Sequence, residues 1–279
     1  MKERNFLTDI KIVGAMLASY EGKLLHYTIP NLLKWCDWVL IMLDNETKPT
    51  HKVAWEYKKK YPARIRIEYT HLPRITKERA RAKTLIRKEK GGYLRRYKEK
   101  ASLMRECVFK YMRNCLDYGE AVDLLMFVDA DEIFSDYLPE VLEKFWAMPD
   151  RIGLSFKPSG VFGDMKTIKK RTMSPHTRVL KFSKEFTAIP YRSLAHYVPL
   201  TRETRWESRY VMIHLNNLLE ETRWWRNIHW KKAIQDPSKP LYTLDKDIRQ
   251  MSPVEILGKI KGKPDTTIEE YLKKHNLTV

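Results

Sequence analysis

The stretch Leu124-Leu125-Met126-Phe127-Val128-Asp129-Ala130-Asp131-Glu132-Ile133-Phe134 joins an unbroken apolar run to three carboxylates within four positions. Such a short run, bounded by acidic residues, is typical of a buried strand of a parallel sheet that emerges at its carboxyl end. Side chains alternate along a strand, so Asp129 and Asp131 should point to the same side. Paired carboxylates repel each other unless a cation joins them, and oxygen ligands suit Mg²⁺ or Mn²⁺. The alternative is a strand followed by an acidic helix cap.

The chain before this stretch alternates strands and helices. We expect strands at residues 9–19, 38–43 and 64–70, and helices at residues 23–35, 50–61, 77–90 and 93–118. Pro30 should kink the first helix or divide it in two. The order of these elements predicts a parallel α/β sheet. Right-handed crossovers would place the carboxyl ends of its strands along one edge, where ligands bind in such sheets.

Composition indicates an ordinary globular protein: 279 residues, of which 43% are hydrophobic, provide for a substantial core. Cys36, Cys107 and Cys115 lack metal-ligand spacing, and we interpret them as reduced core residues of a cytoplasmic protein. The first 25 residues lack the layout of a signal peptide, and no run approaches the roughly 20 apolar residues of a membrane span. We therefore expect a cytoplasmic protein, peripheral on the inner membrane face if it meets a membrane.

The net charge of +18 is unevenly distributed. Residues 77–110 hold thirteen Lys or Arg against four Glu, and residues 157–186 hold eight basic against two acidic residues. Charge on this scale predicts an anionic partner. A nucleotide diphosphate, a nucleic acid and an acidic membrane all satisfy this requirement, and a solvated basic surface is the alternative.

The order of several features resembles a known family. The first strand ends in Ala18-Ser19-Tyr20-Glu21, the second is followed by Asp44, and a long helix precedes Asp129-Ala130-Asp131. This arrangement resembles the GT-A fold glycosyltransferases, and is closest to the family 2-like group with its D-x-D motif. The resemblance covers about residues 11–134 and is looser as far as residue 232.

The resemblance implies a fold and a domain organisation. It implies an α/β, Rossmann-like, mostly parallel central sheet with flanking helices and a small helical C-terminal extension. The catalytic domain would span residues 1–235, with the donor half at about 9–135 and the acceptor half at about 136–235. The extension would span residues 236–279, with capped helices starting at Ser252 and Thr267.

The resemblance also implies a donor site. Ala18, Ser19 and Glu21 would lie near the nucleotide base and ribose, and Asp44 would contact the base. Asp129 would lie near the ribose and the metal, and Asp131 would be the principal ligand of a Mn²⁺ or Mg²⁺ ion. That ion would bridge the phosphates of a nucleotide diphosphate sugar, with a UDP-sugar favoured.

Three further expectations complete this site. His214, at the tip of a strand over residues 211–216, is our candidate for the third metal ligand, with His196 as the runner-up. Glu132 should point away from the aspartate pair and cap the following turn. The loop Asn45-Glu46-Thr47-Lys48-Pro49 departs from the small Ser/Asp cluster common in the family, so the identity of the base stays open.

The acceptor half is expected to contain a helix at residues 137–145, strands at residues 152–162 and 177–182, and a tryptophan-rich basic helix at residues 220–234. The tryptophans of that helix would pack against the sheet, lie in a membrane interface or stack on nucleotides.

The chemistry expected of these parts is transfer of a sugar to an acceptor hydroxyl. An inverting reaction needs a carboxylate base, for which Asp164 is our candidate and Glu185 and Glu203 are competitors; a retaining reaction needs none. The favoured acceptor is an envelope or surface glycan built where the basic surface attracts acidic membrane lipid. The alternatives are a phage-type enzyme that glycosylates hydroxylated bases in DNA, or a non-enzymatic nucleic-acid-binding protein.

Overall fold

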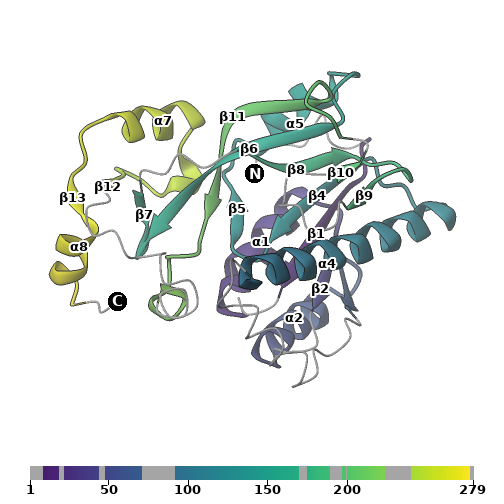
Figure 1. Ribbon diagram of the computed structural model, residues 1–279, viewed down its shortest axis with the longest axis horizontal. Helices are drawn as coiled ribbons and strands as arrows, with labels where there is room; N and C mark the ends of the chain where they lie inside the picture. The colour runs from purple at the N-terminus through teal and green to yellow at the C-terminus, as the bar shows by residue number, and fades with distance from the viewer. Residues whose placement is uncertain are drawn as a thin grey trace.

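A computed structural model of the chain describes residues 9–18, 22–43, 48–70, 92–169, 175–188, 197–198, 200–223 and 240–276. It is an α/β protein with a mixed sheet flanked by helices (Figure 1). The main sheet has the strand order β13-β12-β7-β6-β8-β4-β1-β2-β3, and β11 pairs with both β6 and β5. The predicted helix at residues 77–90 lies outside the described residues, as does the part of the predicted helix at residues 220–234 that follows residue 223.

The parallel half of the sheet contains β3 (Ile65–Tyr69), β2 (Trp38–Leu43), β1 (Ile12–Ala18) and β4 (Leu124–Asp129). All side chains of β1 and β2 are buried, which explains why both strands read as continuous apolar runs. In the register, Ala18 lies beside Leu43 and Leu17 lies beside Asp129. The carboxyl ends of β1, β2 and β4 therefore lie along one edge, as the sequence predicted.

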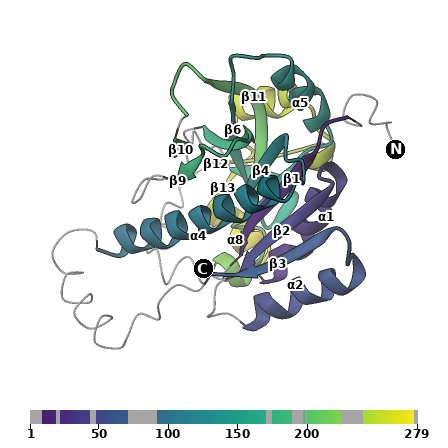
Figure 2. The same ribbon diagram turned by 90° about the vertical axis from the view of Figure 1, so that its right-hand side faces the viewer.

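Helices cover both faces of this half. On one face pack α1 (Leu25–Trp35), α2 (Lys48–Lys60) and α5 (Leu138–Trp146); on the other packs α4 (Gly92–Asp117) (Figure 2). The short η1 (Gly22–Leu24) precedes α1, and Pro30 lies inside α1 without dividing it. None of the helices in the described part of the chain has the length and hydropathy needed to cross a bilayer.

Alternation along β4 decides which helices its side chains meet. Leu125 and Phe127 face α4, whereas Met126 and Val128 face α1 and α5. The end of α4 follows the local sequence: Gly119 adopts φ +79°, and the amide of Glu120 donates to the carbonyl of Cys115.

The other half of the sheet is largely antiparallel, which corrects the expectation of a mostly parallel sheet. Here β8 (His176–Lys181) runs antiparallel between β4 and β6 (Gly153–Phe162). Strand β6 is antiparallel to β7 (Asp164–Lys169) and parallel to β11 (Arg205–His214). Two short strands, β9 (Thr187–Ala188) and β10 (Tyr197–Val198), form a separate pair.

The C-terminal segment contains strands as well as the expected helices. Strand β12 (Pro240–Thr243) pairs with β7, and β13 (Thr266–Thr267) pairs with β12. The helical elements are η2 (Ile248–Gln250), α7 (Pro253–Lys261) and α8 (Ile268–Lys274). Capping boxes at Ser252 and Thr267 begin α7 and α8, which confirms these two predictions. Because β12 pairs with β7, the C-terminal segment extends the main sheet.

Candidate functional site

The turn that follows β4 is fixed from one side by α1. The hydroxyl of Thr28 donates to the carbonyl of Ala130 at 2.7 Å. The Asn31 amide donates to the carbonyl of Phe134 at 2.8 Å and accepts from the amide of the same residue at 2.8 Å. All three contacts are buried, so two polar side chains of α1 hold both ends of the Asp131-containing turn in place.

Strand β11 fixes the turn from the other side. Its end pairs antiparallel with β5 (Glu132–Phe134), with His214 opposite Glu132. Just beyond the strand, the amide of Leu215 donates to the carbonyl of Asp131 at 2.7 Å. The turn is thus held between α1 and β11, which come from the two halves of the chain.

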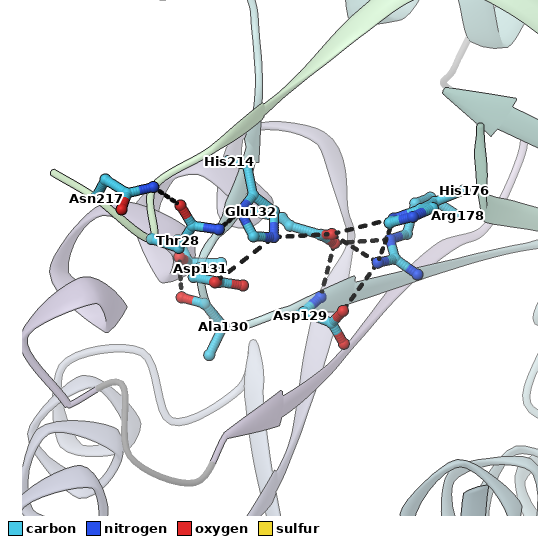
Figure 3. Close-up of polar contacts among 10 residues, drawn as sticks. Thr28, Asp129, Ala130, Asp131, Glu132, His176, Arg178, His214 and Asn217 are labelled. Atoms are coloured by element: carbon cyan, nitrogen blue, oxygen red, sulfur yellow. Dashed lines mark hydrogen bonds and ion pairs between the residues drawn. The ribbon is translucent and has the colours of Figure 1, made fainter. Parts of the chain in front are cut away.

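This arrangement brings Asp131 and His214 together (Figure 3). The His214 Nε2 atom lies 3.6 Å from Asp131 Oδ2 and 3.9 Å from Glu132 Oε1. The side-chain amide of Asn216 contacts His214 Nδ1, so the ring presents Nε2 to Asp131. Both side chains are buried. Two of the three residues predicted as metal ligands are therefore neighbours.

Asp129 has a different partner. Its Oδ2 accepts from Arg178 Nη2 at 2.8 Å, and Arg178 is a fully buried residue of β8. The same guanidinium donates to Glu132 through Nε at 2.7 Å and through Nη2 at 2.6 Å. Figure 3 shows the Asp129 carboxylate directed to Arg178 and the Asp131 carboxylate directed to His214.

The expectation for Glu132 was wrong. Its side chain is completely buried, and its Oε2 accepts from the backbone amide of Asp129 at 3.0 Å. The turn at Ala130 and Asp131 interrupts the alternation of β4, and the side chain of Glu132 reaches back to the amide of Asp129. Glu132 therefore returns to the end of β4 and becomes the main carboxylate partner of Arg178.

The two carboxylates around Arg178 are electrostatically unequal. Burial opposes ionisation of Glu132, but Arg178 and the neighbouring His176 outweigh it and hold the pKa of Glu132 below its usual range. Burial raises the pKa of Asp129. The positive charge of Arg178 lowers this pKa, but the negative charges of Glu132 and Asp131 raise it again. Glu132 thus takes the larger share of the arginine's charge.

The donor set suits a divalent cation at Asp131 and His214. Two atoms that bind one octahedral ion at about 2.1 Å lie roughly 3 to 4 Å apart, and Nε2 and Oδ2 are separated by 3.6 Å. Asp129 fits this role less well, because its Oδ2 is held by Arg178. Within the described ranges there is no set of three or more His, Cys, Asp or Glu side chains grouped as metal ligands.

The remaining predicted donor-site residues fall into two groups. Ala18 ends β1 and is fully buried beside the end of β2. Ser19, Glu21, Asp44 and His196 lie outside the described residues.

The carboxylate candidates for a catalytic base do not join Asp131 and His214. Asp164 opens β7, and its Oδ1 accepts from the amides of Lys166 at 2.8 Å and Thr167 at 2.6 Å. Its Oδ2 accepts from the Tyr271 hydroxyl at 3.2 Å. Strands β6 and β8 separate β7 from β4 in the sheet, as Figure 1 shows. Glu185 and Glu203 are exposed residues of connecting segments.

Sequence reasoning missed Arg178. The sequence did contain an indication: Arg178 is the single charged residue in the buried segment Thr177-Arg178-Val179-Leu180, and a buried charge requires a partner. The partner could not be read from the sequence, since Glu132 lies 46 positions away. A second buried arginine, Arg105 of α4, was likewise read only as part of a basic stretch.

No protein-family model matches the sequence, and no curated protein matches it. Solved structures do match. The crystal structure of S. aureus TarS is 13% identical with a TM-score of 0.38, over 62% of this chain and 28% of that one. The crystal structure of S. aureus TarS 1–349 in complex with UDP-GlcNAc is 14% identical with a TM-score of 0.38, and the match covers 62% of this chain and 45% of that one. The crystal structure of S. aureus TarS 1–349 is 13% identical with a TM-score of 0.40, and the match covers 73% of this chain and 58% of that one. The chain thus spans less than two thirds of the length of each of these three structures.

Proposed function

We propose that this chain is a metal-dependent glycosyltransferase that moves a sugar from a nucleotide diphosphate sugar to an acceptor hydroxyl. The observation that carries the proposal is the juxtaposition of Asp131 and His214, 3.6 Å apart, beside the carboxyl ends of the parallel strands. Ligands of open α/β sheets bind at this edge. The family resemblance assigns the metal to these two residues together with Asp129, and makes Asp131 the principal ligand of the ion that meets the diphosphate.

The residues at this edge of the sheet have distinct proposed roles. Asp131 and His214 would hold Mn²⁺ or Mg²⁺, which when bound neutralises charge on the departing nucleotide diphosphate. Asn216 orients the His214 ring, as outer partners of metal-binding histidines commonly do. Asp129, fixed by Arg178, is proposed to bind the ribose. Ala18, Ser19, Glu21 and Asp44 are proposed to contact the base and ribose, with UDP as the favoured nucleotide.

The acceptor is proposed to be an envelope or surface glycan. The net charge of +18 supports an acceptor or a surface that is anionic, such as acidic membrane lipid. Asp164 is proposed as the general base if the reaction inverts the anomeric centre. Its hydrogen bonds to Lys166, Thr167 and Tyr271 fix the orientation of the carboxylate on β7.

A thermal-shift panel of nucleotide sugars, with and without Mn²⁺, tests donor and metal together. We expect a UDP-sugar to raise the melting temperature only when Mn²⁺ is present, and slow metal-dependent hydrolysis of the same sugar. Asp131→Asn should abolish both effects. Asp136→Asn is the matched control, because Asp136 follows Asp131 on the same segment, is half-exposed and pairs with Lys34 of α1.

If no nucleotide sugar stabilises the protein, and if it binds DNA with a steep dependence on salt, the non-enzymatic nucleic-acid-binding alternative is the better account. If a nucleotide sugar binds and DNA carrying hydroxylated bases is glycosylated, the acceptor proposal is wrong while the transferase proposal stands.

A further inference from the structure

Helix α4 contains a buried arginine, Arg105, for which the described residues provide no hydrogen-bond acceptor at Nε. Arg105 is 4% exposed, and its Nε is buried without a hydrogen-bond partner. No ion pair joins Arg105 to another residue in the portion of the chain that the structure describes. The next arginine along the helix differs: Arg113 donates to Glu106 at 2.6 Å and to the carbonyl of Phe186 at 2.7 Å.

Arg105 lies beside the carboxyl end of β4. Its Cζ is 5.8 Å from the ring centroid of Phe127, which faces α4 in the apolar cluster that α4 forms with the sheet. Side chains alternate, so Asp129 leaves the strand on the same side as Phe127. The arginine therefore approaches the proposed donor site from the helix above it.

The neighbouring carboxylates are already engaged elsewhere. Asp129 Oδ2 and both oxygens of Glu132 accept hydrogen bonds from Arg178. Removing a cation from water costs free energy that a direct partner normally offsets. Arg105 incurs this cost through a buried Nε that finds no acceptor. An anionic group that enters from the sheet edge would supply the missing acceptor.

We propose that Arg105 binds the diphosphate of the donor nucleotide. The planar, forked donors of a guanidinium match phosphate oxygens. This inference rests on the proposed function, because the diphosphate is assigned to the edge where β4 ends. Arg105 and the cation held by Asp131 and His214 would then each neutralise part of the negative charge of the diphosphate.

The test compares Arg105→Met with Arg105→Lys in the full chain, using UDP and UMP as probes in the presence of Mg²⁺ and isothermal titration calorimetry as the measurement. Met keeps the length and removes the charge, and Lys keeps the charge. Loss of a charged hydrogen bond predicts about 10- to 100-fold weaker UDP binding by the Met variant, with a smaller change for UMP. The Lys variant should fall between the Met variant and the wild-type protein. Arg113→Met is the matched control on the same helix and should leave the UDP to UMP affinity ratio unchanged.

Thermal unfolding without nucleotide separates binding from a structural role. A ligand-binding arginine without a partner predicts an unchanged or higher melting temperature for Arg105→Met. A lower melting temperature, with UDP and UMP weakened equally, overturns the inference. Equal UDP affinity of Arg105→Met and wild type overturns it while the proposed function stands. If the wild-type protein binds no nucleoside diphosphate at all, the proposed function fails and this inference fails with it.

Discussion

Arg178 and Glu132 form a two-point ion pair in which neither side chain is exposed to solvent. The pair joins β8 to the turn after β4, and the same guanidinium reaches Asp129. The turn that holds Asp131 is therefore fixed by a buried charge as well as by α1 and β11. Asp131 is not part of this ion pair, and the contribution of the pair to stability can be measured in the absence of any ligand.

Glu132→Gln should destabilise the fold strongly. The change leaves the buried Arg178 guanidinium beside a neutral amide, and breaking a buried ion pair from one side costs about 3 to 5 kcal/mol. The pKa of Glu132 is lowered in the folded state, so its stabilising effect is complete above its unfolded pKa of about 4.3. The difference between wild type and variant in urea unfolding should shrink as the pH falls below about 4. A difference that grows on acidification contradicts this assignment.

Asp129→Asn should behave in the opposite way. The folded-state pKa of Asp129 is raised, so its ionised form is disfavoured by folding at pH values above the unfolded pKa. At neutral pH the Asn variant should unfold at the same urea concentration as wild type or at a higher one. A loss as large as that of Glu132→Gln would show that Asp129 and Glu132 contribute equally to holding Arg178 and would contradict the inequality between them.

Asn31→Ala should loosen the turn. The substitution leaves the buried amide and carbonyl of Phe134 without their side-chain partner, and about 1 to 3 kcal/mol is lost for each such group. We expect roughly 2 to 4 kcal/mol in denaturant unfolding. Asn114→Ala, on the exposed side of α4, is the matched control and should change stability by less than about 0.5 kcal/mol. Equal effects of the two substitutions would rule out the anchoring role of Asn31.

How much of this architecture the sequence predicts depends on the range of the interactions. The segment 38–43 was predicted with the bounds that β2 has, because a fully buried strand leaves an apolar run that needs no distant information. The capping boxes at Ser252 and Thr267 were predicted for the same reason: donor and acceptor lie three residues apart. The common edge of β1, β2 and β4 followed from the alternation of strands and helices.

Long-range pairings were not accessible in this way. Arg178 and Glu132 are 46 positions apart, and only the antiparallel insertion of β8 beside β4 brings them together. Strand β12 is four residues long and carries no clear alternation, so its pairing with β7 had no local signal. The direction of Glu132 depended on the turn geometry at Ala130, which a strand pattern does not contain.

His214→Ala should weaken cation binding, if Asp131 and His214 hold the metal as proposed. The substitution removes one of two neighbouring donors, and even the loss of an outer partner such as Asn216 typically costs about 10- to 100-fold in metal affinity. Titration of free Mn²⁺ by electron paramagnetic resonance measures this without turnover. His176→Ala is the control, because His176 lies 4.0 Å from Glu132 and, in the part of the chain that the structure describes, forms no ion pair with Asp131 or His214. Unchanged Mn²⁺ affinity in His214→Ala would exclude it as a ligand.

Gly163 and Gly119 form a natural matched pair, because both adopt φ near +78° but differ in the space around them. A Cβ at Gly119 would meet no atom within 4 Å, so Gly119→Ala should cost only the backbone strain of about 1 to 2 kcal/mol. A Cβ at Gly163 would lie 2.5 Å from the hydroxyl of Tyr271, the group that donates to Asp164. Gly163→Ala should therefore lose more stability than Gly119→Ala in the same denaturant titration. Removal of the hydroxyl in the double variant Gly163→Ala, Tyr271→Phe should recover part of that excess, with a coupling of about 0.5 to 3 kcal/mol in a double-mutant cycle. A coupling of zero would mean that the chain relieves the clash by moving α8 away from β7.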